Sequence, residues 1–156
     1  KDASLKDLKR FRQIVFPASH KIIHALRNPF DIISNWNASR SSRKHLNHQG
    51  EANLINAINH YEKYARIIND TYYNNKSINN NVIQIRNEDF CINPKESLKK
   101  LSEFLELELD TKWLEACANI VKPSHRRVNE VKWSEEMKYK VYYFIDKYSF
   151  LNRYEY

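Results

Sequence analysis

The chain has 156 residues, and its 26 Lys and Arg outnumber its 19 Asp and Glu to give a formal net charge of +7. This length suits one compact domain that buries its core without disulfides or metals. The positive charge favours an anionic partner, which can be a nucleic acid, an acidic lipid surface or a phosphorylated small molecule. Composition alone does not decide among these three.

Several protein classes are disfavoured by what the sequence lacks. Cys91 and Cys117 have no metal-like or C-x-x-C spacing, so we expect reduced, buried thiols rather than a disulfide-built secreted domain. No apolar run approaches the ~20 residues that span a bilayer, and residues 1–13 are too charged for a signal peptide, so the chain is expected to be soluble. The single glycine, Gly50, excludes a glycine-rich phosphate loop, so an anion must be held by side chains and helix ends.

The first predicted element is a strand over residues 22–26. Its sequence, IIHAL, is almost continuously apolar, which is typical of a parallel sheet covered on both faces. Arg27 follows at the carboxyl end of the strand. Asn28 is then a candidate N-cap, and Pro29 suits the first position of a helix.

The middle of the chain is predicted to alternate between loops and regular structure. Residues 39–50 are basic and without periodicity, which predicts a loop, and 70–81 predict a second one. Between them, a long helix is expected over 51–68, and a second strand over 82–86. The apolar face of that helix comprises Leu54, Ile58, Tyr61, Ala65 and Ile68. Strand, helices and strand in this order predict a right-handed crossover between parallel strands.

Three helices are predicted in the rest of the chain. Asn93 is the expected N-cap of the first, with Pro94 at its first position, Asp110 caps the second, and Ser134 opens the last. A basic loop over 121–133 separates the last two. The side chains expected to face inward are Leu98, Leu101 and Leu105 in the first helix, Trp113, Leu114, Cys117 and Val121 in the second, and Met137, Val141, Phe144, Ile145 and Tyr148 in the last.

The end of the first strand is the candidate anion site. In open α/β sheets, ligands bind beyond the carboxyl ends of the strands, where helix N-termini offer free N–H groups. Ser34 follows Arg27 by about two helical turns, so a guanidinium and a hydroxyl can grip one phosphate from two sides. The alternative interpretation is a surface ion pair for Arg27 and no role for Ser34.

Three stretches, in this order, resemble sulfotransferases that use 3′-phosphoadenosine 5′-phosphosulfate (PAPS). KIIHALRNPFDIISNW is similar to their 3′-phosphate-binding strand–turn–helix, in the subgroup with R-N-P-[FY]-D-x-[IL]-[ST]. RNEDFCINPKESLKKLSEFLEL and the region from Trp113 to Tyr156 resemble later parts of the same family. The resemblance implies that Arg27 and Ser34 hold the 3′-phosphate. It also implies a basic loop that closes over the nucleotide with Lys122, Ser124, Arg126 and Arg127.

The resemblance further implies an α/β fold with a three-layer parallel sheet of the P-loop nucleotide-kinase-like type. Residues 1–156 would form the C-terminal portion of a single sulfotransferase domain, because the family's first strand and phosphosulfate loop have no counterpart here. We therefore expect an N-terminal segment or a second chain to complete the sheet. The implied donor is PAPS, its product is 3′-phosphoadenosine 5′-phosphate (PAP), the acceptor is a hydroxyl or amine, and no metal is expected.

No catalytic residue is predicted. His24 is expected to be a packed strand residue. The other histidines have no recognisable catalytic partner in the sequence; they are His20, His45, His48, His60 and His125. Glu88 and Asp89 are expected to cap backbone groups or pair with a base rather than bind a metal. Two alternatives stay open, a non-catalytic sulfotransferase-like binding module and, less favoured, a basic domain that binds RNA or another polyanion. The sequence names neither the acceptor nor the compartment, cytoplasm or Golgi lumen.

Overall fold

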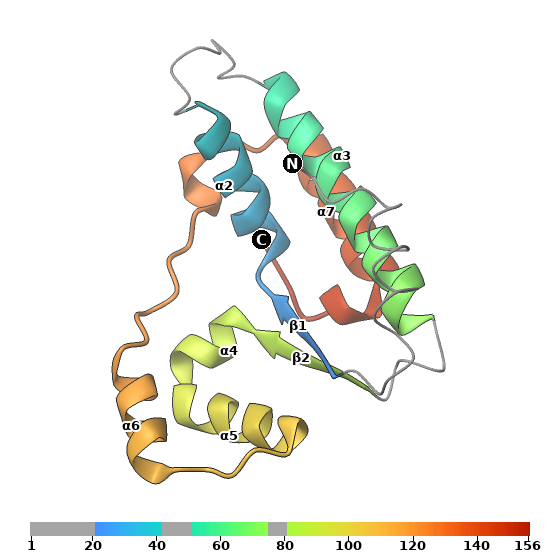
Figure 1. Cartoon of the computed structure of the whole chain (residues 1–156). Coiled ribbons are helices and arrows are strands. Elements are labelled where there is room, and N and C mark those ends of the chain that lie inside the picture. Colours follow the sequence, from blue (N-terminus) through green and yellow to red (C-terminus); the bar gives the residue numbers. More distant parts are fainter. Residues whose placement is uncertain (1–20, 42–50, 75–80) are drawn as a thin grey trace.

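Two short parallel strands lie at the centre of the molecule (Figure 1). The computed structural model describes residues 21–41, 51–74 and 81–156. Strand β1 (Ile22–Leu26) pairs with β2 (Val82–Arg86) in a parallel ladder, with Ile22 opposite Val82 and Leu26 opposite Arg86. Both predicted strands are confirmed, and their carboxyl ends reach the same edge of the sheet.

The remaining described elements are helices and helical turns. In chain order the other described elements are α2 (Pro29–Ser41), α3 (Glu51–Ile68), the π-helical turn η1 (Asn69–Tyr73), α4 (Asn87–Ile92), α5 (Pro94–Leu105), α6 (Thr111–Asn119), the 3-10 turn η3 (Val128–Glu130), α7 (Glu135–Lys147) and the 3-10 turn η4 (Ser149–Leu151). Helices α3 and α7 lie together on one side of the strands, and α4 to α6 lie on the other (Figure 1). The mixed α/β architecture predicted from the sequence is confirmed.

The main core lies between α2, α3 and α7. The apolar faces predicted for α3 and α7 are confirmed, because their stripe residues are buried in one cluster with Phe30 and Ile33 of α2, except Ile68, which is partly buried against that cluster. Local signals also define the helix starts. Ser134 accepts a hydrogen bond from the backbone N–H of Met137 at 3.3 Å, and Asp110 accepts one from Lys112 at 2.8 Å. Both are side-chain N-caps of the predicted kind.

Helix boundaries differ from the sequence predictions in the two predicted loops. Helix α2 continues to Ser41, so residues 39–41 are helical rather than part of a loop. The turn η1 extends α3 through Asn69–Tyr73, where a loop was also predicted. Polar residues disfavour helix only weakly, and an established helix extends one residue at a time at little cost. The remainder of these loops, 42–50 and 75–80, lies outside the described residues.

The region after β2 contains a helix that the sequence did not indicate. Helix α4 begins at Asn87, directly after the strand, and it is too short to show apolar periodicity. Asn93 occupies the N-cap position of α5, but its side chain makes no capping hydrogen bond, so that part of the prediction was wrong. The backbone of Asn93 joins the two helices: its N–H donates to the carbonyl of Asp89 at 2.9 Å at the end of α4, and its carbonyl accepts the N–H of Ser97 at 3.1 Å in the first turn of α5.

Three burial predictions need correction. Ile23 of β1 is 46 % exposed, so the strand is not covered on both faces within the described structure. Trp113 is 47 % exposed, because α6 buries the i, i+4 pair Leu114 and Ala118 instead. The two cysteines are free but only half-buried. The uncovered residues all belong to the sheet or to the α4–α6 side, away from the main core.

Candidate functional site at the carboxyl ends of the strands

Asn28 fixes the start of α2 with three hydrogen bonds. Its Oδ1 accepts the backbone N–H of Phe30 at 2.9 Å, which confirms the predicted N-cap. Its own backbone N–H donates to Glu88 Oε1 at 2.8 Å, and its Nδ2 donates to the carbonyl of Glu155 at 2.7 Å. Asn28 therefore joins the end of β1 to α4 and to the C-terminal tail, which passes beside α2 (Figure 1).

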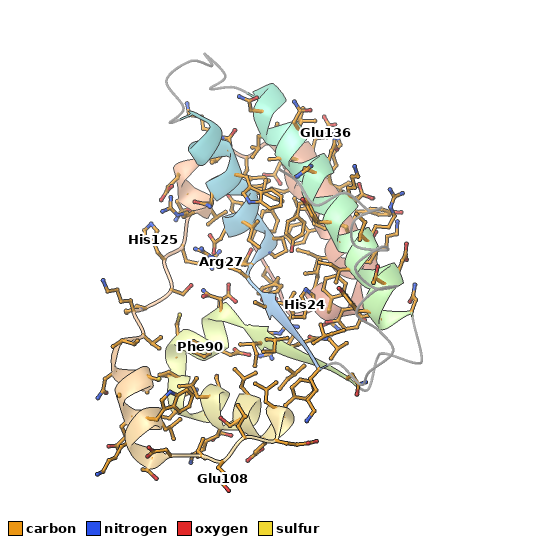
Figure 2. All side chains as sticks on the ribbon, viewed as in Figure 1. His24, Arg27, Phe90, Glu108, His125 and Glu136 are labelled. Carbon is orange, nitrogen blue, oxygen red and sulfur yellow. The ribbon has the colours of Figure 1, made fainter. Side chains whose placement is uncertain are left out.

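Arg27 projects from the end of β1 toward the basic loop. Figure 2 shows it where β1 meets α2, with His125 on the segment that passes it. Its Nη2 donates to the backbone carbonyl of His125, and its Nε is buried without a hydrogen-bond partner among the described residues. The surface ion pair of the alternative interpretation is therefore not found for Arg27 within the described part of the chain. Its guanidinium faces a neutral carbonyl and retains a buried donor.

Ser34 lies in the second turn of α2, seven residues after Arg27. Its side chain is 0 % exposed, and its Oγ has no hydrogen-bond partner in the described structure. Buried hydroxyls almost always have a partner, and an unpartnered one requires an explanation such as a missing ligand or water. The two groups that the sequence selected for an anion, Arg27 Nε and Ser34 Oγ, are therefore both buried donors without an acceptor.

The basic loop is pinned to α2 by Asp31, a residue to which the sequence analysis gave no role. Asp31 is fully buried, and its Oδ1 accepts the backbone N–H groups of Arg127 at 2.7 Å and of Val128 at 2.9 Å. Its Oδ2 lies 3.2 Å from Nε of Arg126, in an ion pair that falls short of hydrogen-bond geometry. One carboxylate thereby caps the turn η3 and neutralises a neighbouring guanidinium.

The other loop residues predicted to bind the nucleotide differ in the contacts that they make. Ser124 Oγ accepts a hydrogen bond from Asn87 Nδ2 at 2.8 Å, so it lies at the end of β2. Arg127 pairs with Glu130 at 3.2 Å, and the same carboxylate lies 3.1 Å from Nε2 of His125. Lys122 is exposed, and no hydrogen bond or ion pair connects it to the described part of the chain. The structure thus connects Ser124, Arg126 and Arg127 to the strand ends, whereas Lys122 makes no such contact among the described residues.

Glu88 and Asp89 have the structural roles expected of them. Besides its bond to the backbone of Asn28, Glu88 accepts the hydroxyl of Tyr154 at 3.2 Å, and Asp89 lies 3.4 Å from Nη1 of Arg153. Burial, and then the adjacent Glu88 carboxylate, raises the pKa of the Tyr154 hydroxyl above its ordinary value. The tyrosine is therefore a neutral hydrogen-bond donor that anchors the C-terminal tail near the site.

His24 is packed beneath the strand ends rather than poised for proton transfer. Its Nδ1 lies 2.6 Å from the hydroxyl of Tyr73, and its ring packs edge-on against Phe150 at 5.2 Å. Burial, with a smaller contribution from the Arg86 guanidinium, lowers the pKa of His24 to about 4. The imidazole is consequently neutral near pH 7 and shares a hydrogen bond with the Tyr73 hydroxyl. Of the other histidines, His20, His45 and His48 lie outside the described residues.

The described residues include neither a metal-binding cluster nor a membrane-spanning helix. They contain no group of three His, Cys, Asp or Glu side chains arranged to hold a metal ion. None of the helices found in them has the length and apolar character needed to cross a membrane.

Comparison with known proteins concerns nearly the whole chain. A family model described as "Sulfotransferase domain" matches residues 6–155. The sulfotransferase domain from the curacin biosynthetic pathway is similar in structure, with a TM-score of 0.59 and 16 % identity over 93 % of this chain. Mouse sulfotransferase SULT7A1, solved in complex with PAP, is also similar in structure, with a TM-score of 0.51 and 15 % identity over 91 % of this chain. This chain spans 59 % and 60 % of those two chains. No curated protein sequence matches.

Proposed function

Because this chain belongs to the sulfotransferase domain family, we propose that it binds PAPS and takes part in transferring the sulfuryl group to a hydroxyl or amine acceptor. The observation that carries the proposal is the pair of buried, unpartnered donors, Arg27 Nε and Ser34 Oγ, beyond the end of a parallel strand. A phosphate supplies the acceptor oxygens that both groups lack. The SULT7A1 structure, solved with PAP, is consistent with this ligand class.

In this proposal the 3′-phosphate of the nucleotide sits between Arg27 and Ser34. The N-terminus of α2 adds a favourable dipole, although Asn28 already occupies one of its free N–H groups. The loop that carries Lys122, Ser124, Arg126 and Arg127 passes over the same place. Since Ser34 is fully covered, the side chains above it must move before a phosphate can reach its hydroxyl.

The chemistry of transfer limits what these residues do. The acceptor oxygen or nitrogen attacks sulfur, the bond from sulfur to the 5′-phosphate oxygen breaks, and the acceptor proton passes to a base. Arg27 and Ser34 act at the other phosphate, so they hold and orient the donor and do not touch the reacting atoms. No described residue is assigned as the base.

We also propose that residues 1–156 are the C-terminal portion of one sulfotransferase domain. The chain spans only 59 % and 60 % of the two similar structures, and Ile23 of β1 is exposed although its strand is strongly apolar. An N-terminal segment or a second chain would cover that residue, and a strand contributed by it would pair with a sheet edge that is open among the described residues. The same part of the molecule would supply contacts to the 5′-phosphosulfate.

Transfer is tested with PAPS that carries radioactive sulfur, using the protein together with any N-terminal segment that precedes this chain. We expect the label to move to a hydroxyl- or amine-containing acceptor, with one PAP formed for each sulfuryl group. The Arg27→Ala variant should lose most of this transfer at donor concentrations that are limiting for the wild type. Tight PAP binding without transfer to any acceptor in a broad panel would instead indicate a non-catalytic binding module, and the enzyme proposal would be wrong.

A further inference from the structure

We propose that Asp31 is a positioning residue of the 3′-phosphate site, and that Arg126 is its counter-ion rather than a ligand of the phosphate. This inference rests on the proposed function for the identity of the ligand. It concerns a fully buried carboxylate that lies one helical turn before Ser34 and contacts the basic loop through both of its oxygens.

The first argument is geometric. Three successive loop residues, Arg126, Arg127 and Val128, meet the Asp31 carboxylate, and the residue before them, His125, offers its carbonyl to Arg27. Asp31 therefore determines where the His125 carbonyl lies, and that carbonyl orients the Arg27 guanidinium. Since Asp31 and Ser34 are three residues apart on α2, they occupy the same helix face. The carboxylate thus aligns both proposed phosphate ligands without touching the phosphate.

The second argument is electrostatic. A buried carboxylate beside a phosphate site repels the ligand unless a cation neutralises it, and a buried charge that loses its partner is strongly unfavourable. Arg126 is the cation in that position, with its Nε 3.2 Å from Asp31 Oδ2. Arg127 is paired with Glu130 in the same way. Of the three arginines that the sequence analysis placed at this site, Arg27 is the one without a carboxylate partner in the described structure, so it is the one that remains for the phosphate.

The loop anchor is tested on the ligand-free protein by hydrogen exchange of the backbone amides. In Asp31→Ala we expect the amides of Arg127 and Val128 to exchange at least about 10-fold faster, because their acceptor is gone. The amide of Met137, capped by Ser134, is the internal control and should keep its protection. Asp31→Asn retains an acceptor oxygen and should restore most of the protection. Unchanged exchange at Arg127 and Val128 in Asp31→Ala would overturn the anchor.

The counter-ion role is tested by a double-mutant cycle on PAP affinity. We expect Arg126→Gln to weaken PAP binding about 10-fold in the wild type, where it leaves Asp31 unneutralised, but less than about 3-fold in Asp31→Asn. An equal loss in both backgrounds would make Arg126 a direct phosphate ligand and would overturn the inference. A wild type that binds no PAP contradicts the proposed function and with it the phosphate role of Asp31. The exchange experiment decides the loop anchor in either case.

Discussion

Replacing Arg27 with alanine is expected to weaken PAP binding by about 100-fold, the largest functional effect of any single substitution in this chain. Arg27 supplies the proposed charge-assisted contact to the 3′-phosphate, and hydrogen bonds to charged groups contribute about 1.5–3 kcal/mol each. Among the described residues its buried Nε has no acceptor, and its guanidinium donates to the neutral carbonyl of His125. Titration calorimetry with PAP measures the change directly.

Two further variants separate the specific effect from the loss of one positive charge. Arg27→Lys keeps the charge but not the planar fork of donors, so it should recover only part of the affinity. Arg66→Ala removes an exposed arginine near the end of α3, and it should leave PAP binding nearly unchanged. Similar losses in Arg27→Ala and Arg66→Ala would indicate that general positive charge, and not a defined site, binds the nucleotide.

Phe30→Ala is expected to cause the largest loss of stability near the site, about 3–5 kcal/mol in the free energy of unfolding. Phe30 is fully buried in the first turn of α2. Its ring lies edge-on to three others, with centroid distances of 5.1 Å to Trp133, 5.4 Å to Tyr142 and 5.1 Å to Tyr156. Truncation leaves a cavity where α2, α7 and the C-terminal tail meet.

Urea unfolding of the purified chain measures this loss. Tyr139→Ala removes an aromatic side chain from α7 that is 72 % exposed, so it should change the free energy of unfolding by less than about 0.5 kcal/mol. Phe30→Leu keeps much of the volume and should fall between the two. A cost below about 1 kcal/mol for Phe30→Ala would show that the ring cluster does not hold α2 in place.

The fold was predictable where the deciding signals are local. The strand over 22–26, the cap at Asn28 and the helix start at Pro29 all depend on neighbours a few residues away, and the structure confirms each. The apolar stripe of the last helix was equally plain, because five inward positions repeat at helical spacing. Family resemblance then gave the sheet type, and the comparisons support that fold.

The role of Asp31 was not predictable from its neighbourhood, because its acceptor function depends on backbone groups 96 and 97 positions further along the chain. An acidic residue in the first turn of a helix is ordinarily explained by the helix dipole, so nothing local marked this one as an anchor. The available signal was its spacing, since residues 27, 31 and 34 share one side of the strand–helix junction. The inward position predicted for Trp113 was wrong, because helix α6 places Leu114 and Ala118 inward and leaves Trp113 exposed.

The central claim is that this chain holds a nucleotide by its 3′-phosphate. It is tested most directly by titrating the wild-type protein with PAP and with adenosine 5′-monophosphate, which differ only by that phosphate. The account predicts that PAP binds at least about 10-fold more tightly, since one set of charge-assisted hydrogen bonds is added. Ser34→Ala should reduce this ratio, because Ser34 Oγ is one of the two proposed donors. Equal affinities for the two nucleotides, or binding of neither, would contradict the account.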